Sequence, residues 1–242
     1  MIERSEGGAV HSSRRSAWIA LAILVPAPTI GTTFGLLGPD DDVVGEAVYV
    51  ASKVWLFGLP LIWLLLVDRR SISLSPPRQG GTLVATAIGL GMLAVIVGGY
   101  LLFGHALVDS QSAREIAEGT GLVDPRRFIL FAAYITFINA LLEEYVWRWF
   151  VFEKCEIGLS GRPAIAVLLA ALFFTVHHTV ALAIQFDWIV VVLGSIGVFV
   201  AAAIWSWMYQ RYRSVWVPYI SHILADIGVF IVGWMILFPA NG

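Results

Sequence analysis

The chain has 242 residues and a formal net charge of -2; 59% of its residues are hydrophobic and 13% are charged. Soluble domains usually carry about 25% charged residues, so this composition argues against an ordinary soluble domain. The small net charge gives no electrostatic basis for nucleic-acid binding, and the single cysteine, Cys155, excludes an intrachain disulfide.

The apolar residues form seven long blocks that predict seven membrane-spanning helices. A bilayer core about 30 Å thick needs about 20 helical residues, and each block reaches that length. A β-barrel is the other backbone arrangement that lipid allows, but it needs short alternating strands that this sequence lacks. We therefore predict an all-α polytopic membrane helix bundle. Its segments lie near residues 17–38, 47–67, 82–104, 127–152, 163–185, 187–210 and 215–238.

The domain organisation predicted from these blocks is simple. Residues 1–15 form a polar N-terminal tail, and residues 16–242 form a single transmembrane helical domain with its site-bearing helices in residues 127–238. Arg14 and Arg15 precede the first block, as in a signal peptide. The block continues to Leu37, beyond the length of a signal h-region, so a membrane helix is the better interpretation.

Two shorter features precede the fourth block. Residues 111–118 predict a short surface helix ended by Gly119. Asp124 and Pro125 have the pattern of an N-cap followed by the first helical residue, which predicts that the fourth helix begins there.

Basic residues are distributed unequally between the two ends of the predicted bundle. The positive-inside rule then places the N-terminus in the cytoplasm and the C-terminus outside. The basic residues of the first end are Arg4, Arg14, Arg15, Arg69, Arg70, Arg78, Arg148, Lys154, Arg162, Arg211 and Arg213, and those of the second are Arg114, Arg126 and Arg127.

Ionisable side chains cluster inside three of the seven segments. Each costs about 2.5–3.5 kcal/mol at the centre of a membrane helix, so they are expected to face one another or a water-filled cavity. Counting 1.5 Å per residue from the helix ends places them in overlapping layers. They are Glu143, Glu144 and Arg148 in the fourth segment, His177 and His178 in the fifth, and His222 and Asp226 in the seventh. Lys53, in the second segment, is interpreted as snorkelling or as pairing with a carboxylate.

The spacing of these residues predicts local roles. Glu144 and Arg148 are separated by four residues, so Arg148 can neutralise the Glu144 carboxylate. Glu143 is turned about 100° away and can face a cavity. His222 and Asp226 have the same spacing, so Asp226 can orient the imidazole or hold water or substrate beside it.

Three motifs in these segments resemble those of a known family. The sequences EEYVWR, FFTVH and HILAD are similar to the EExxxR, FxxxH and HxxxN/D motifs of the CAAX-protease and bacteriocin-processing (CPBP, or Abi) family of intramembrane proteases, which includes the type II CAAX prenyl endopeptidases. The resemblance covers about residues 140–230. It implies an intramembrane endopeptidase that hydrolyses a peptide bond of a membrane-associated or lipidated, CAAX-like protein or peptide.

The resemblance also implies roles for the residues that match the motifs. Glu143 and His177 activate the attacking water, Glu144 and Arg148 position the site, and His222 and Asp226 stabilise the oxyanion. Because the third motif ends in Asp and a carboxylate repels an oxyanion, we expect Asp226 to orient His222 instead. His178 also follows a phenylalanine by four residues; we favour His177 because LFxxxH is the usual local form.

The cofactor stays open at this stage. The family is described both as metal-dependent and as using a glutamate mechanism without metal. Glu143, His177 and His222 form a set that can hold a divalent metal such as zinc with an open position for water. The absence of HExxH excludes only the zincin arrangement.

Two other functions use the same residues. Buried Glu, His and Asp side chains also line the pathways of transporters and proton-coupled carriers, although the chain lacks the two related halves with interrupted helices that such carriers often have. A non-catalytic bacteriocin-immunity protein is the second alternative, and the intact motifs favour an enzyme over it. The oligomeric state cannot be predicted from these features.

Overall fold

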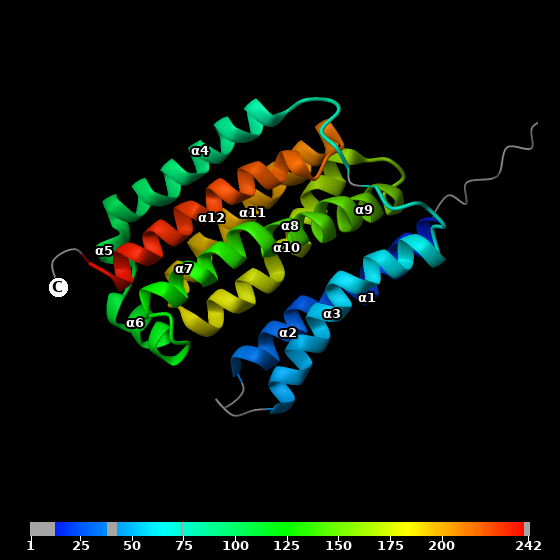
Figure 1. The fold of residues 1–242 in the computed structure, drawn as a ribbon. Coiled ribbons are helices and arrows are strands. Elements are labelled where there is room, and N and C mark those ends of the chain that lie inside the picture. Colours follow the sequence, from blue (N-terminus) through cyan, green and yellow to red (C-terminus); the bar gives the residue numbers. More distant parts are fainter. Residues whose placement is uncertain (1–12, 38–42, 74, 240–242) are drawn as a thin grey trace, which may run out of the picture.

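A computed structural model describes residues 13–37, 43–73 and 75–239, and every regular element among them is helical (Figure 1). Residues 1–12 of the predicted polar tail lie outside this part of the chain. The elements are α1 (Arg14–Leu24), α2 (Pro26–Leu37), α3 (Val43–Leu66), α4 (Thr82–Gly99), η1 (Tyr100–Gly104), α5 (His105–Leu107), α6 (Ser110–Gly119), α7 (Pro125–Ala133), η2 (Tyr134–Asn139), α8 (Ala140–Glu144), η3 (Tyr145–Phe152), α9 (Glu153–Gly158), α10 (Pro163–Gln185), α11 (Trp188–Tyr212) and α12 (Trp216–Leu237).

Within the described residues, seven helical stretches are long and apolar enough to cross a membrane, which confirms the predicted all-α polytopic bundle. Large apolar side chains such as Leu83, Val95 and Leu102 are exposed on its surface. Lipid is the solvent that such a surface requires. The spans are Arg14–Leu37, Val43–Leu66, Thr82–Gly104, Pro125–Gly158, Pro163–Gln185, Trp188–Tyr212 and Trp216–Leu237.

The helix boundaries follow from local sequence signals. The first span is interrupted at Val25, directly before Pro26, because proline has no backbone N–H to continue the helix. The predicted surface helix is α6. The side chain of Asp124 accepts hydrogen bonds from the backbone N–H groups of Arg126 and Arg127, and Pro125 follows it, so the predicted start of the fourth span is confirmed.

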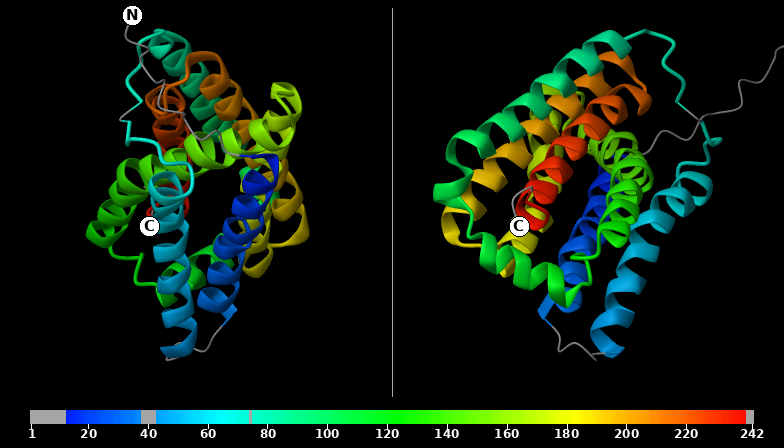
Figure 2. Two further views of the ribbon diagram at one scale, coloured as in Figure 1. Left: turned by 90° about the vertical axis from the view of Figure 1, so that its right-hand side faces the viewer. Right: turned by 60° about the vertical axis from the view of Figure 1, so that its left-hand side comes forward.

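Long helices pack in pairs, and one of these pairs, α4 with α12, joins helices that are far apart in the sequence. α4 lies alongside α12, α10 alongside α11, and α2 alongside α3 (Figures 1 and 2). Glycines allow the first of these pairs to approach closely. A Cβ on Gly89 would lie 2.9 Å from Ser221 Cα, and one on Gly228 would lie 3.2 Å from Leu93 Cα. The position of α12, which carries His222, therefore depends on these two glycines.

The fourth span is one long helix with two wider, π-helical segments, η2 and η3, on either side of α8. Such segments shift the helical register and are frequent at functional sites. Tyr219 Oη donates a hydrogen bond of 2.8 Å to the Phe137 carbonyl in η2. This bond ties α12 to the widened turn just before the two adjacent glutamates.

The fourth span continues to Gly158, beyond the predicted end at residue 152. Ion pairs explain this extension. Lys154 Nζ lies 2.5 Å from Asp68 Oδ2, and both residues are buried. Glu153 pairs with Arg70, and Glu156 forms two hydrogen bonds with Arg213. These contacts fix α9 against the ends of α3 and α11, so a polar sequence stays helical.

The buried pair leads to a prediction about stability. We expect Asp68→Asn to lower the free energy of unfolding by about 3 kcal/mol, because losing one partner of a buried ion pair costs about 3–5 kcal/mol. The measurement is thermal unfolding in detergent.

Glu153→Gln is the matched control. Its pair with Arg70 is more exposed, with side-chain exposures of 23% and 50%, so we expect a loss below about 1 kcal/mol. Equal destabilisation by the two substitutions would contradict a special role for the buried pair.

Candidate active site

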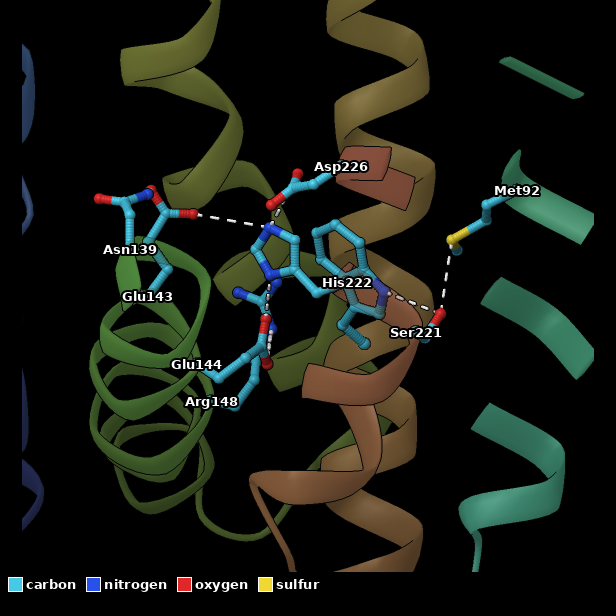
Figure 3. A network of polar contacts seen from close by, with 9 residues as sticks. Met92, Asn139, Glu143, Glu144, Arg148, Ser221, His222 and Asp226 are labelled. Carbon is cyan, nitrogen blue, oxygen red and sulfur yellow. Dashed lines mark hydrogen bonds and ion pairs between the residues drawn. The ribbon is translucent and has the colours of Figure 1, made fainter. Parts of the chain in front are cut away.

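The ionisable residues of the fourth, fifth and seventh spans lie together in one part of the bundle. Glu143 and Glu144 end α8, Arg148 follows in η3, His177 and His178 lie on α10, and His222 and Asp226 on α12. Figure 3 shows the central part of this arrangement, with His222 between the carboxylates. The structure thus brings together all the residues that the sequence selected.

A chain of charged contacts crosses the most buried part of the cluster. His222 Nδ1 lies 2.8 Å from Glu144 Oε1, and Arg148 Nε lies 3.2 Å from Glu144 Oε2 (Figure 3). The side chains of Glu144 and Arg148 are fully buried. The expected contact between Glu144 and Arg148 is present, and Glu144 also holds His222, which the sequence did not indicate.

Asp226 lies on the other side of the His222 ring. Its Oδ1 is 3.7 Å from Nε2, which is ion-pair distance without a hydrogen bond. The hydrogen bond on the imidazole therefore involves Glu144, and not Asp226 as expected from the i,i+4 spacing. Glu143 Oε2 is 3.8 Å from the same Nε2, so two carboxylates flank the nitrogen that Glu144 does not bind.

The indole of Trp205 fixes the orientation of the His222 ring by stacking on it. Trp205, on α11, stacks on it with ring centroids 4.0 Å apart and an interplanar angle of 19°. Trp205 Nε1 in turn donates to Ser221 Oγ at 3.2 Å, and this hydroxyl contacts Met92 Sδ at 3.6 Å (Figure 3). Sequence reasoning missed Trp205, since a tryptophan in an apolar block has no spacing that distinguishes it from a packing residue.

Aromatic rings also surround the Arg148 guanidinium. Its Cζ lies 4.7 Å from the ring centroid of Phe174 and 5.3 Å from that of Trp205. The negative faces of such rings attract a cation, most strongly where water is excluded. The buried positive charge is therefore stabilised by Glu144 and by two ring faces.

Glu143 has a different environment from Glu144. Asn139 Nδ2 donates a hydrogen bond of 2.9 Å to Glu143 Oε1 (Figure 3). The Glu143 side chain is 12% exposed and that of Asp226 is 18% exposed, whereas that of Glu144 is inaccessible. Asn139 was not predicted, although its position four residues before Glu143 was a usable signal.

The two adjacent histidines both face the cluster. The His177 ring stacks on Trp147 at a centroid distance of 5.2 Å and an angle of 9°, and its Nδ1 is buried with no hydrogen-bond partner among the described residues. His178 Nδ1 lies 3.0 Å from the Phe174 carbonyl oxygen. The two rings are 4.1 Å apart, so both histidines belong to the site.

A divalent metal fits one subset of these residues. Donor atoms of Glu143, His177 and His178 lie within 4.8 Å of one another, and the ligands of a tetrahedral zinc ion are about 3.4 Å apart. The hydrogen bond from His178 Nδ1 to a carbonyl leaves its Nε2 as the ligand atom, an arrangement common in metal sites. His178 thus takes the place that the sequence analysis gave to His222 in the candidate metal set.

Residues 125–228 match the family model for the type II CAAX prenyl endopeptidase Rce1-like proteins. The matched segment contains all three motifs and the residues that form the cluster. No curated protein and no solved structure matches the chain. The family match confirms the resemblance indicated by the motifs, and together with the seven spans it identifies an integral, multi-pass membrane protein.

The two glutamates are predicted to differ in their effect on stability. We expect Glu144→Gln to lower the free energy of unfolding by about 3–5 kcal/mol, because it leaves the Arg148 guanidinium buried without its carboxylate. Glu143→Gln keeps an oxygen for Asn139 and lies on the accessible side, so we expect a loss below about 1 kcal/mol. Thermal unfolding in detergent measures both, and a Glu143 variant as unstable as the Glu144 variant would show that this assignment is wrong.

Proposed function

We propose that the protein is an intramembrane endopeptidase, because residues 125–228 match the family model for type II CAAX prenyl endopeptidase Rce1-like proteins. Its substrate is a membrane-associated or lipidated, CAAX-like protein or peptide. One observation carries the proposal. Glu143, His177 and His222 come from three motifs on three spans, and Glu143 lies close to both histidines.

Glu143 is the general base of the proposed reaction. It is accessible, and Asn139 fixes one of its oxygens, so the other can accept a proton from water. His177 lies beside it and helps to position that water. The activated water attacks the substrate carbonyl carbon, Glu143 takes the proton, and the proton then passes to the leaving amine as the C–N bond breaks.

His222 stabilises the oxyanion that forms during the attack. As an imidazolium it has two N–H groups. Nδ1–H donates to Glu144, and Nε2–H faces the side on which Glu143 lies. A donor fixed before the reaction stabilises developing negative charge without reorganisation. Glu144, Arg148 and Trp205 act through His222 by holding its ring, and Asp226 balances the charge at Nε2.

A divalent metal such as zinc, when bound, would be held by Glu143, His177 and His178 and would polarise the carbonyl under attack. In that case Glu143 and His177 would act as ligands, and His222, Glu144 and Arg148 would keep the tasks given above. His178 is fixed by the Phe174 carbonyl, and His222 Nε2 remains 3.8 Å from Glu143 Oε2.

The proposal predicts the behaviour of four variants in a cleavage assay. With purified protein in nanodiscs and a panel of prenylated and transmembrane peptides, we expect Glu143→Gln and His177→Ala to reduce kcat at least about 100-fold, the typical contribution of general acid–base catalysis. Trp205→Phe should retain most activity because it keeps an aromatic ring on His222, whereas Trp205→Ala should lose more than about 10-fold as the ring loses its support.

The same assay with a chelator separates the two chemistries. Cleavage that survives chelation assigns a metal-free glutamate mechanism. Cleavage that falls on chelation and also in His178→Ala assigns a metal held by that histidine. If Glu143→Gln cleaves as well as the wild type, the proposed mechanism is wrong, and ion-flux assays in liposomes then test the carrier alternative.

We also propose that the N-terminus faces the cytoplasm. The basic residues of one end, including Arg14, Arg70, Lys154 and Arg213, lie where α1 begins and α3, α9 and α11 end. The positive-inside rule places that end in the cytoplasm. Cysteines introduced at Ser13 and Ser110 test this in intact cells after Cys155→Ser. We expect an impermeant thiol reagent to label the second and not the first, and the reverse pattern would overturn the orientation.

A further inference from the structure

One charged residue near the site is not used by the proposed mechanism. Lys53 lies near the middle of α3, about 20 Å from the end at Leu66 and about 15 Å from the start at Val43, counting 1.5 Å per residue. Its side chain is half-buried. A lysine side chain extends only about 6 Å and cannot snorkel to an interface from this depth.

Lys53 has no carboxylate within ion-pair distance among the described residues. Its ammonium instead lies 5.5 Å from the ring centroid of Tyr49 and 6.0 Å from that of Phe57. Neither of the explanations that the sequence suggested therefore holds for the described part of the chain. Ionisable groups within a membrane are costly and are usually functional. We therefore expect this ammonium to bind an anion.

The packing of its helix places Lys53 near the candidate active site. α3 contacts η3, the segment that carries Arg148. Glu143 and His177 lie about 22 Å and 21 Å from the helix ends at Gly158 and Pro163. Lys53 is thus in the same layer as the proposed general base, on a different span.

We infer that Lys53 binds the C-terminal carboxylate of the peptide substrate and so sets which peptide bond reaches Glu143. This inference rests on the proposed function. A CAAX sequence ends three residues beyond its cysteine, and three extended residues cover about 10 Å. A cation beside the site in the same layer suits that span, whereas a lipid phosphate does not reach mid-membrane depth.

The acidic residues of the site also favour a peptide whose C-terminus points toward α3. Glu143 and Asp226 are on the accessible side of the cluster, and they repel a carboxylate. The substrate terminus is therefore excluded from the α12 side and attracted to α3. Tyr49 and Phe57 flank the ammonium on one face of α3, at positions that can contact the apolar side chains before the terminus.

The test compares two peptides that differ at one group. A prenylated CAAX peptide is prepared with a free C-terminal carboxylate and with a carboxamide, each carrying a fluorophore for anisotropy and a quencher for cleavage. Binding and cleavage are measured for the full-length protein in nanodiscs. The variants are Lys53→Met, Lys53→Arg and, as a control on the same helix, Glu46→Gln.

We expect the wild type to bind the carboxylate peptide about 10- to 100-fold more tightly than the carboxamide, the usual range for one charge-assisted hydrogen bond. Lys53→Met should bind both peptides as the wild type binds the carboxamide. Lys53→Arg and Glu46→Gln should keep the preference. Thermal unfolding of each variant checks that the fold is intact.

Two results would overturn the inference: equal binding of both peptides by the wild type, or an unchanged preference in Lys53→Met. The readouts also separate it from the proposed function. Cleavage by the wild type together with equal binding of both peptides supports the protease and rejects the role of Lys53. A carboxylate preference that depends on Lys53, without cleavage of either peptide, supports the site for the chain end and rejects the protease.

Discussion

The burial of the Arg148 guanidinium within a membrane protein is the constraint on which the rest of the site depends. Its side chain is inaccessible, and a bare charge at that depth is too costly to persist. Glu144 lies four residues before it on the same helix and provides the counter-charge, while Phe174 and Trp205 provide ring faces from α10 and α11. Compensating one charge therefore requires three helices to meet. Glu144 then has an oxygen left for His222, which brings α12 into the same cluster.

The backbone is adapted to this convergence at two places. Gly89 and Gly228 let α4 and α12 approach closely enough that a Cβ at either position would lie about 3 Å from the Cα of a residue on the other helix. The widened turns η2 and η3 enclose α8, so the two glutamates project from a short α-helical segment whose register is offset from the helix on both sides. The bond from Tyr219 to Phe137 connects these two adaptations. The residues of the candidate site therefore depend on packing that lies outside the motifs.

The sequence predicted the spans well because a bilayer imposes length and polarity on every helix. It selected the ionisable residues of the cluster for the same reason, since ionisable residues stand out in apolar segments. It could not predict the partners. The hydrogen bond between His222 and Glu144 joins residues on different spans, and helix periodicity carries no information about rotation between helices. The same holds for Trp205, whose stacking depends on how α11 faces α12. The break at Val25 and the extension of α9 to Gly158 were missed because a hydropathy pattern gives no weight to one proline or to ion pairs with a loop.

The two sides of the cluster differ in exposure, and this difference suits them to different roles. On one side Glu144, Arg148 and His222 are buried, and Glu144 pairs with both of the others, so their geometry is fixed before any substrate arrives. On the other side Glu143 and Asp226 are partly accessible, and His177 retains a nitrogen without a partner among the described residues. A hydrolytic site needs both properties, because a stabilising donor gains from rigidity whereas a base must reach water and substrate. If the buried side had been the accessible one, water would have screened the Glu144–Arg148 pair. The distribution of exposure therefore supports Glu143, and not the adjacent Glu144, as the residue that contacts the reacting water.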